Sequence, residues 1–214
     1  MLFLRRNRRR SRLCSQLERL VRGRRAANRD RAVIFRDTNV AGVRIVELEP
    51  LADERGFFAR SYCAVEFANT GIDIQPVQLN VSRNISRGTL RGMHYQAEPS
   101  PEPKLVRCTA GRVFDVAVDL RPTSPSFYRW TSVELDAIAY NGLFIPPGCA
   151  HGFLTLSDDT EVTYLAGAAY VPELACGVRW NDPAFAIAWP FEPEIMSEKD
   201  ASYPDFDPEP LKGP

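Results

Sequence analysis

Phe114-Asp115-Val116-Ala117-Val118-Asp119-Leu120 is the stretch that most clearly indicates the fold. Large apolar residues occupy every second position, and Asp115 and Asp119 stand between them. Successive side chains of a β-strand point to opposite faces, so a period of two is the pattern of a strand. The stretch therefore predicts an extended segment in a sheet.

Similar short segments surround it. Residues 43–48, 78–82, 143–145 and 162–164 are also strand-like, and 67–71 predicts one helical turn ended by glycine. The 17 prolines and 13 glycines indicate many turns, which recur at roughly 8–12 residues. This spacing predicts an all-β sandwich or barrel.

Charge is distributed unevenly along the 214 residues, although the net charge is zero. Residues 1–36 hold 13 of the 27 basic residues, which leaves a net charge of −11 for residues 37–214. An acidic body is a poor partner for nucleic acid. We expect a basic extension over 1–36, with helical apolar spacing at Leu13, Leu17, Leu20 and Val21, a domain over 37–202, and an acidic, proline-rich tail over 203–214.

Cysteine usage and hydropathy bear on location. The five cysteines form no CxxC pair, which favours reduced thiols in a cytoplasmic protein. No run of about 18 apolar residues is present, so we expect no membrane span.

The chain has only two histidines, His94 and His151, and histidine is the side chain best suited to moving protons near neutral pH. On a regular strand, His94 shares a face with Leu90, Gly92 and Gln96, and its two small or apolar neighbours leave room for a ligand. Tyr164 and Tyr170 lie six residues apart and would share a face in the same way; as an alternative, they are core residues with satisfied hydroxyls. A metal site with two histidines and an acid is a further alternative, which the absence of an HxH pair weakens.

Motifs in a fixed order carry a resemblance to a known family. From about residue 40 to 200 the chain resembles the dTDP-4-dehydrorhamnose 3,5-epimerases. The matching motifs are Asp53-Glu54-Arg55-Gly56-Phe57-Phe58, Gln78-x-Asn80-x-Ser82, Gly88-Thr89-Leu90-Arg91-Gly92-Met93-His94-Tyr95-Gln96, Lys104-Leu105-Val106-Arg107, Asp115-Val116-Ala117-Val118-Asp119-Leu120-Arg121, Ile145-Pro146-Pro147-Gly148-Cys149-Ala150-His151-Gly152-Phe153, Trp180-Asn181-Asp182-Pro183 and Ser197-Glu198-Lys199-Asp200.

The resemblance implies a cupin-type jelly-roll β-barrel with short peripheral helices, and a homodimer. It also implies a nucleotide-sugar substrate, a 6-deoxy-4-keto hexose whose carbonyl acidifies the C3 and C5 hydrogens. Removal and return of each proton through an enolate would invert both carbons without a metal or redox cofactor.

The resemblance also implies roles for individual residues. His94 matches the proton acceptor, Asp200 the carboxylate that orients it, and Tyr164 the proton donor. Lys104 and His151 match residues beside the sugar carbonyl, and Tyr170 matches the residue that stacks on the base. The remaining matches are to positions that bind the nucleotide or its diphosphate: Arg55, Gln78, Asn80, Arg91 and Lys199.

Two positions depart from the family pattern. Glutamate is common in the family where Arg60 stands and near Ala175. Both changes fall in the ligand-contact set, so an epimerase that inverts one carbon, or one that acts on another nucleotide-linked 4-keto sugar, is an alternative. A non-catalytic cupin that binds sugar nucleotides is a third, which the presence of His94, Tyr164 and Asp200 together argues against.

Overall fold

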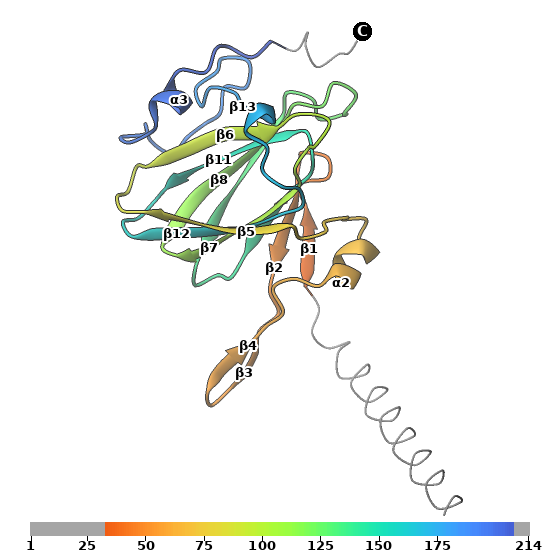
Figure 1. Cartoon of the computed structure of the whole chain (residues 1–214). Helices are drawn as coiled ribbons and strands as arrows, with labels where there is room; N and C mark the ends of the chain where they lie inside the picture. Colours follow the sequence, from red (N-terminus) through yellow and green to blue (C-terminus); the bar gives the residue numbers. More distant parts are fainter. Residues whose placement is uncertain (1–32, 208–214) are drawn as a thin grey trace, which may run out of the picture. The chain divides into compact units, whose positions relative to one another are not determined.

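A computed structural model describes residues 33–207 of the chain (Figure 1). The chain divides into two compact units, which are described separately. The larger comprises Ile34–Glu47 and Cys63 onward, and the smaller includes Leu48–Tyr62. The helical spacing noted at 13–21 and the end of the expected tail, 208–214, lie outside the described residues.

Two antiparallel sheets form the larger unit. The six-stranded sheet has the order β1-β2-β10-β7-β12-β5, and the five-stranded sheet has the order β13-β6-β11-β8-β9. The strands of the first are β1 Ile34–Asp37, β2 Arg44–Glu47, β10 Gly142–Ile145, β7 Lys104–Ala110, β12 Thr160–Ala166 and β5 Gln78–Asn84. Those of the second are β13 Ala175–Gly177, β6 Leu90–Gln96, β11 Cys149–Thr155, β8 Arg112–Asp119 and β9 Trp130–Asp136.

The core lies between these sheets. One buried cluster joins Val106 of β7 and Val162 of β12 to Ala117 of β8 and Phe153 of β11. The strand predicted from the alternation at 114–120 is confirmed as β8, and both of its faces are buried. Even its acidic residue Asp115 is fully inaccessible to solvent.

The outer face of the five-stranded sheet is covered by the C-terminal segment. Val178, Phe185 and Ile187 pack there against Met93 and Val116. The side chain of Phe206 packs against the same cluster. Phe206 thus lies beyond residue 203, where we expected the tail to begin, and β1 begins at Ile34, three residues before the expected start of the domain.

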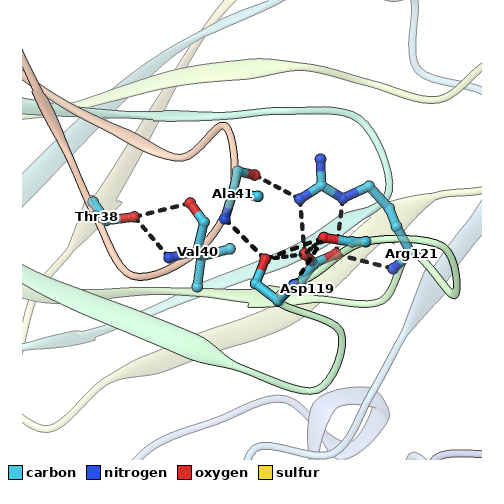
Figure 2. A network of polar contacts seen from close by, with 7 residues as sticks. Thr38, Val40, Ala41, Asp119 and Arg121 are labelled. Carbon is cyan, nitrogen blue, oxygen red and sulfur yellow. Dashed lines mark hydrogen bonds and ion pairs between the residues drawn. The ribbon is translucent and has the colours of Figure 1, made fainter.

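A polar network ties the end of β8 to the turn between β1 and β2 (Figure 2). Asp119 accepts hydrogen bonds from Arg121 Nε at 2.8 Å, from Ser124 Oγ at 2.5 Å and from Ser126 Oγ at 2.6 Å. Arg121 and Ser126 also bond the backbone of Ala41. Burial alone would raise the pKa of Asp119, but these hydrogen bonds outweigh burial and hold it below its usual value.

The described part of the smaller unit contains a hairpin, β3 Leu51–Asp53 and β4 Gly56–Phe58. Asp53 accepts a hydrogen bond from the backbone N–H of Arg55 at 2.8 Å and pairs with its guanidinium. Gly56 has a φ of +122°, a conformation that favours glycine.

The larger unit is a cupin-type jelly-roll barrel, so the expected fold class is confirmed. Its helices are short: α2 Ala64–Asn69, the 3-10 turn η1 Pro172–Leu174, and α3 Glu198–Ala201. Between residues 33 and 207, no helix has the length and apolar character needed to cross a membrane.

Candidate active site

Two adjoining cavities open among the strands of the larger unit. The first has a volume of about 790 Å³ and the second about 380 Å³. Both are lined by Arg91 and His94 from β6, Lys104 from β7 and Tyr164 from β12. Since β6 belongs to one sheet and β7 and β12 to the other, side chains from both sheets meet in one space.

His94 and Asp200 form a pair in the first cavity. His94 Nε2 and Asp200 Oδ1 are 2.7 Å apart, and the backbone N–H of Gly92 donates to Asp200 Oδ2 at 3.3 Å. Ser197 caps α3 by accepting from the Asp200 N–H at 3.1 Å, which fixes the carboxylate. Burial would raise the pKa of Asp200, but the bond to His94 and the other contacts together lower it.

The ionisation of Asp200 determines how His94 is protonated. An ionised carboxylate only accepts hydrogen bonds, so Nε2 of His94 must carry the donated proton. Nδ1 is then the ring nitrogen with a lone pair when the imidazole is neutral. The pair can therefore act as a base through Nδ1 of His94.

Gly92 holds this arrangement together through close backbone contact. A Cβ at this position would lie 2.4 Å from Gly152 Cα of β11, and its φ is +136°. The expectation that Gly92 leaves room for a ligand is therefore wrong, because β11 occupies that room. The pairing of β6 with β11 shifts between Arg91 and His94, so both side chains reach the cavity despite their odd spacing.

Tyr164 lines both cavities from β12 and is half-buried. Burial raises the pKa of its phenol, nearby Glu102 raises it further, and Arg91 acts in the opposite direction. The phenol therefore stays protonated at neutral pH and can donate a proton.

Lys104 and His151 bring further donors to the second cavity. Lys104 Nζ lies 3.1 Å from Glu102 Oε2. His151 Nε2 lies 2.8 Å from Oδ1 of Asp115, whose pKa is raised by its complete burial more than the histidine lowers it. His151 also pairs directly with His94 in the register of β11 and β6.

The other predicted binding residues of the larger unit line the first cavity: Gln78, Asn80, Arg91, Tyr170 and Lys199. Tyr170 does not share a strand with Tyr164, as the spacing predicted, because β12 ends at Ala166. It is instead held by its backbone N–H, which donates to Gln78 Oε1 at 2.8 Å. Ala175, the position that departs from the family pattern, also lines this cavity.

Arg55 lies on the hairpin of the smaller unit, where it pairs with Asp53. Its role in binding stays a prediction, as does the effect of Arg60, which belongs to the same unit.

Glu102 and Tyr203 line the first cavity but were missed in the sequence. Glu102 stands two residues before Lys104, a spacing that shares a face in an extended chain, so this signal was present. Tyr203 carried none, because it lies in the acidic, proline-rich end. Its ring centroid is 6.3 Å from that of His94, and it packs where a Cβ on Gly177 would otherwise stand.

Metal ligation was the alternative for the histidines. Among residues 33–207, no group of three or more His, Cys, Asp or Glu side chains is placed to hold a metal ion.

The arrangement described above offers a base, a phenol and two hydrogen-bond donors around one space, which suits transfer of a proton to and from a bound molecule.

Comparison with known proteins identifies the family. A sequence model of dTDP-4-dehydrorhamnose 3,5-epimerase matches residues 37–208. The dTDP-4-dehydrorhamnose 3,5-epimerase of Escherichia coli (strain K12) is 46% identical over 165 residues, covering 76% of this chain and 89% of that protein.

Solved structures agree. The crystal structure of dTDP-4-dehydrorhamnose 3,5-epimerase from Bacillus anthracis str. Ames, with TDP and PPi bound, has a TM-score of 0.79 at 38% identity and covers 82% of this chain and 100% of its own. The crystal structure of a 3'-monoepimerase from Streptomyces bikiniensis, in complex with dTDP-quinovose, has a TM-score of 0.73 at 33% identity. The match covers 78% of this chain and 85% of that chain. Sequence and structure thus agree over most of the chain, which belongs to the dTDP-4-dehydrorhamnose 3,5-epimerase family.

Proposed function

We propose that the protein inverts C3 and C5 of a dTDP-linked 4-keto-6-deoxyhexose, the reaction for which its relatives are named. One observation carries the proposal: the His94–Asp200 pair and the Tyr164 phenol line the same cavity from opposite sheets. Inversion requires a base on one face of the sugar carbon and an acid on the other. A base and an acid on facing sheets meet that requirement.

The proposed mechanism starts at His94. Nδ1 removes the proton next to the C4 carbonyl, and the Asp200 carboxylate stabilises the imidazolium that forms. Tyr164 then returns a proton to the opposite face. The imidazolium gives up its proton to water and the phenolate takes one from water, which resets both groups, and the cycle repeats at the second carbon. The carbonyl itself supplies the acidity, so this chemistry requires neither a metal nor a redox cofactor.

Negative charge develops on the C4 oxygen in the enolate. Lys104 and His151 line the second cavity and are the proposed donors to that oxygen. Loss of one such donor typically lowers turnover about 10²–10³-fold.

Binding of the nucleotide is assigned to the first cavity. Lys199 and Arg91 are suited to the diphosphate, and Tyr170, which is 59% exposed, to stacking on the base. Gln78 and Asn80 on β5 offer hydrogen bonds, and Arg55 of the hairpin is proposed as a further phosphate contact.

The test is incubation of dTDP-4-keto-6-deoxyglucose with the protein in D₂O, followed by NMR. Deuterium at both C3 and C5 supports the proposal, and no exchange at either carbon, with a folded protein, contradicts it. The His94→Ala variant is expected to lose exchange while it still binds TDP. Normal exchange in that variant would refute the assignment of the base.

A single-site epimerase is the second candidate. The likeness to the 3'-monoepimerase from Streptomyces bikiniensis favours it, as does Ala175 in the cavity wall. Deuterium at only one of the two carbons would establish this function instead.

We also propose that the protein is a homodimer in the cytoplasm. The outward face of edge strand β5 exposes Leu79 by 69% and Val81 by 63%, next to Val77 at 55%. Apolar side chains on an unpaired edge favour association with a second copy. The four cysteines between residues 33 and 207 are free thiols, in keeping with a reducing compartment. Light scattering in solution tests the dimer. The unaltered protein should have the mass of two chains and the Leu79→Asp variant the mass of one. A mass of one chain for the unaltered protein would exclude the dimer.

A further inference from the structure

Inside the cavity, Lys104, a proposed donor to the enolate oxygen, is paired with Glu102, a carboxylate that the proposed mechanism does not use. Glu102 Oε2 is 3.1 Å from Lys104 Nζ, and the two side chains are only 10% and 12% exposed. By contrast, the surface pair of Arg112 and Glu134 exposes about half of each side chain. A nearly buried ion pair loses hydration and adds little to stability, so its placement calls for a reason other than folding.

The backbone holds Glu102 rigidly. Pro101 and Pro103 flank it, so its neighbours have fixed φ angles and Glu102 itself is restricted to extended conformations. The carbonyl of Pro103 accepts a hydrogen bond from the N–H of Gly167 at 2.9 Å, which anchors the segment to the end of β12. The backbone that carries Glu102 is therefore fixed before any ligand binds, and the ion pair with Lys104 orients its carboxylate.

The segment also sits beside Tyr164. Strands β7 and β12 are neighbours (Figure 1). Lys104 pairs with Ala166, two residues from Tyr164 on the same face of β12. Glu102, Lys104 and Tyr164 all line the first cavity. A carboxylate, an ammonium group and a phenol thus share one wall, facing the sheet that carries His94.

We propose that Glu102 is a positioning residue of the epimerase: it holds the Lys104 ammonium against this wall and places a negative charge beside the Tyr164 phenol. The inference rests on the proposed function and deepens it. Without the carboxylate, Lys104 could adopt other rotamers of its long side chain, and its alignment with an enolate oxygen would be lost.

Electrostatics gives this residue a second effect. The charged and titratable groups that share the second cavity with Tyr164 are Arg83, Arg91, His94, Lys104 and His151. The first cavity adds two carboxylates, those of Glu102 and of Asp200, and the second of these is already paired with His94. It also adds Tyr95, Tyr170, Cys176, Lys199 and Tyr203. After burial, Glu102 is the strongest influence that raises the pKa of Tyr164, and Arg91 opposes it. Removing the charge of Glu102 should therefore lower the pKa of the phenol.

The test is Glu102→Gln, which keeps the shape of the side chain and removes its charge. We expect kcat to fall by about 10- to 100-fold, as is typical when a supporting residue is removed, with little change in TDP affinity. Because the phenol must be protonated to donate, the alkaline limb of the kcat/KM profile should move to lower pH. Glu98→Gln, the same change at an exposed residue of the same loop, is the matched control and should leave both unchanged.

Glu102→Asp separates the two effects. It keeps the charge but shortens the reach to Lys104, so turnover should fall while the alkaline limb stays near its original pH. The proposal is overturned if Glu102→Gln has the turnover of the native protein and its alkaline limb does not move. If Glu102→Gln does not fold, native turnover in Glu102→Asp overturns the proposal instead. Absence of exchange in the unaltered protein would instead contradict the proposed function, so the two failures are distinguishable.

Discussion

Asp200→Asn probes the pair on which the proposed chemistry depends. In the native chain, Asp200 accepts from His94 Nε2 through one oxygen and from the Gly92 N–H through the other. An asparagine keeps only one oxygen. The Gly92 N–H can only donate, so the amide oxygen is expected to remain there and the amide NH₂ group to turn toward His94.

That orientation changes the tautomer of His94. Nε2 would have to accept a hydrogen bond, so the ring proton would move to Nδ1, the nitrogen that the mechanism needs as a base. A hydrogen bond to a charged group contributes about 1.5–3 kcal/mol. At about 1.36 kcal/mol per factor of ten, loss of this bond alone corresponds to roughly 10- to 150-fold in rate. The wrong tautomer adds to it, and a comparable Asp→Asn change in serine proteases lowers kcat by about 10⁴.

The assay is the rate of deuterium incorporation at C3 and C5 of the substrate, together with calorimetric binding of TDP. We expect Asp200→Asn to lower kcat by about 10²–10⁴-fold while TDP affinity changes little. Glu198→Gln, on the exposed side of α3, is the matched control. A rate within about threefold of that of the native protein would be a smaller change than loss of one charged hydrogen bond produces. It would refute the role of the pair.

Three further predictions follow from the geometry. Tyr164→Phe should lower turnover at least about 100-fold with TDP binding retained, and equal turnover by the NMR assay would remove the donor assignment. Gly92→Ala should lower the free energy of unfolding by at least about 2 kcal/mol, because the new Cβ would meet Gly152 and the backbone φ at this position is positive. Urea denaturation measures this change, and an unaltered midpoint would contradict the close contact. Asp119→Asn should lower the same free energy by about 2–4 kcal/mol. Because the pKa of Asp119 is lower when folded, its contribution is complete above the ordinary value of 3.8 and is lost as the pH falls through the folded value, so native and variant stabilities should converge in acid.

Several features could be predicted from local sequence. The alternation in β8 indicated a strand because side-chain direction along an extended chain depends only on the backbone. The ordered motifs identified the family, and with it the barrel and the residues to examine. His94, Lys104 and Tyr164 were expected in one site, and the structure brings them into one cavity.

Other features depended on tertiary contacts. The register shift between β6 and β11 brings Arg91 and His94 to one cavity against their sequence spacing, and the space expected beside Gly92 is filled by Gly152. Both acids of β8 are buried, although alternation alone says nothing of what covers each face.

The chain by itself indicated several of the strands and carried the motifs that identify the family, because both are local properties of residue order. Only the tertiary structure decided which groups meet. His94 and Asp200 are separated by 106 residues, yet their side chains lie 2.7 Å apart because the capped turn of α3 is held against β6. Glu102 and Lys104 are two residues apart in the sequence, but their near burial arises only in the folded chain. Distances between residues far apart in sequence, and the exclusion of water around them, arise from packing and have no local signature.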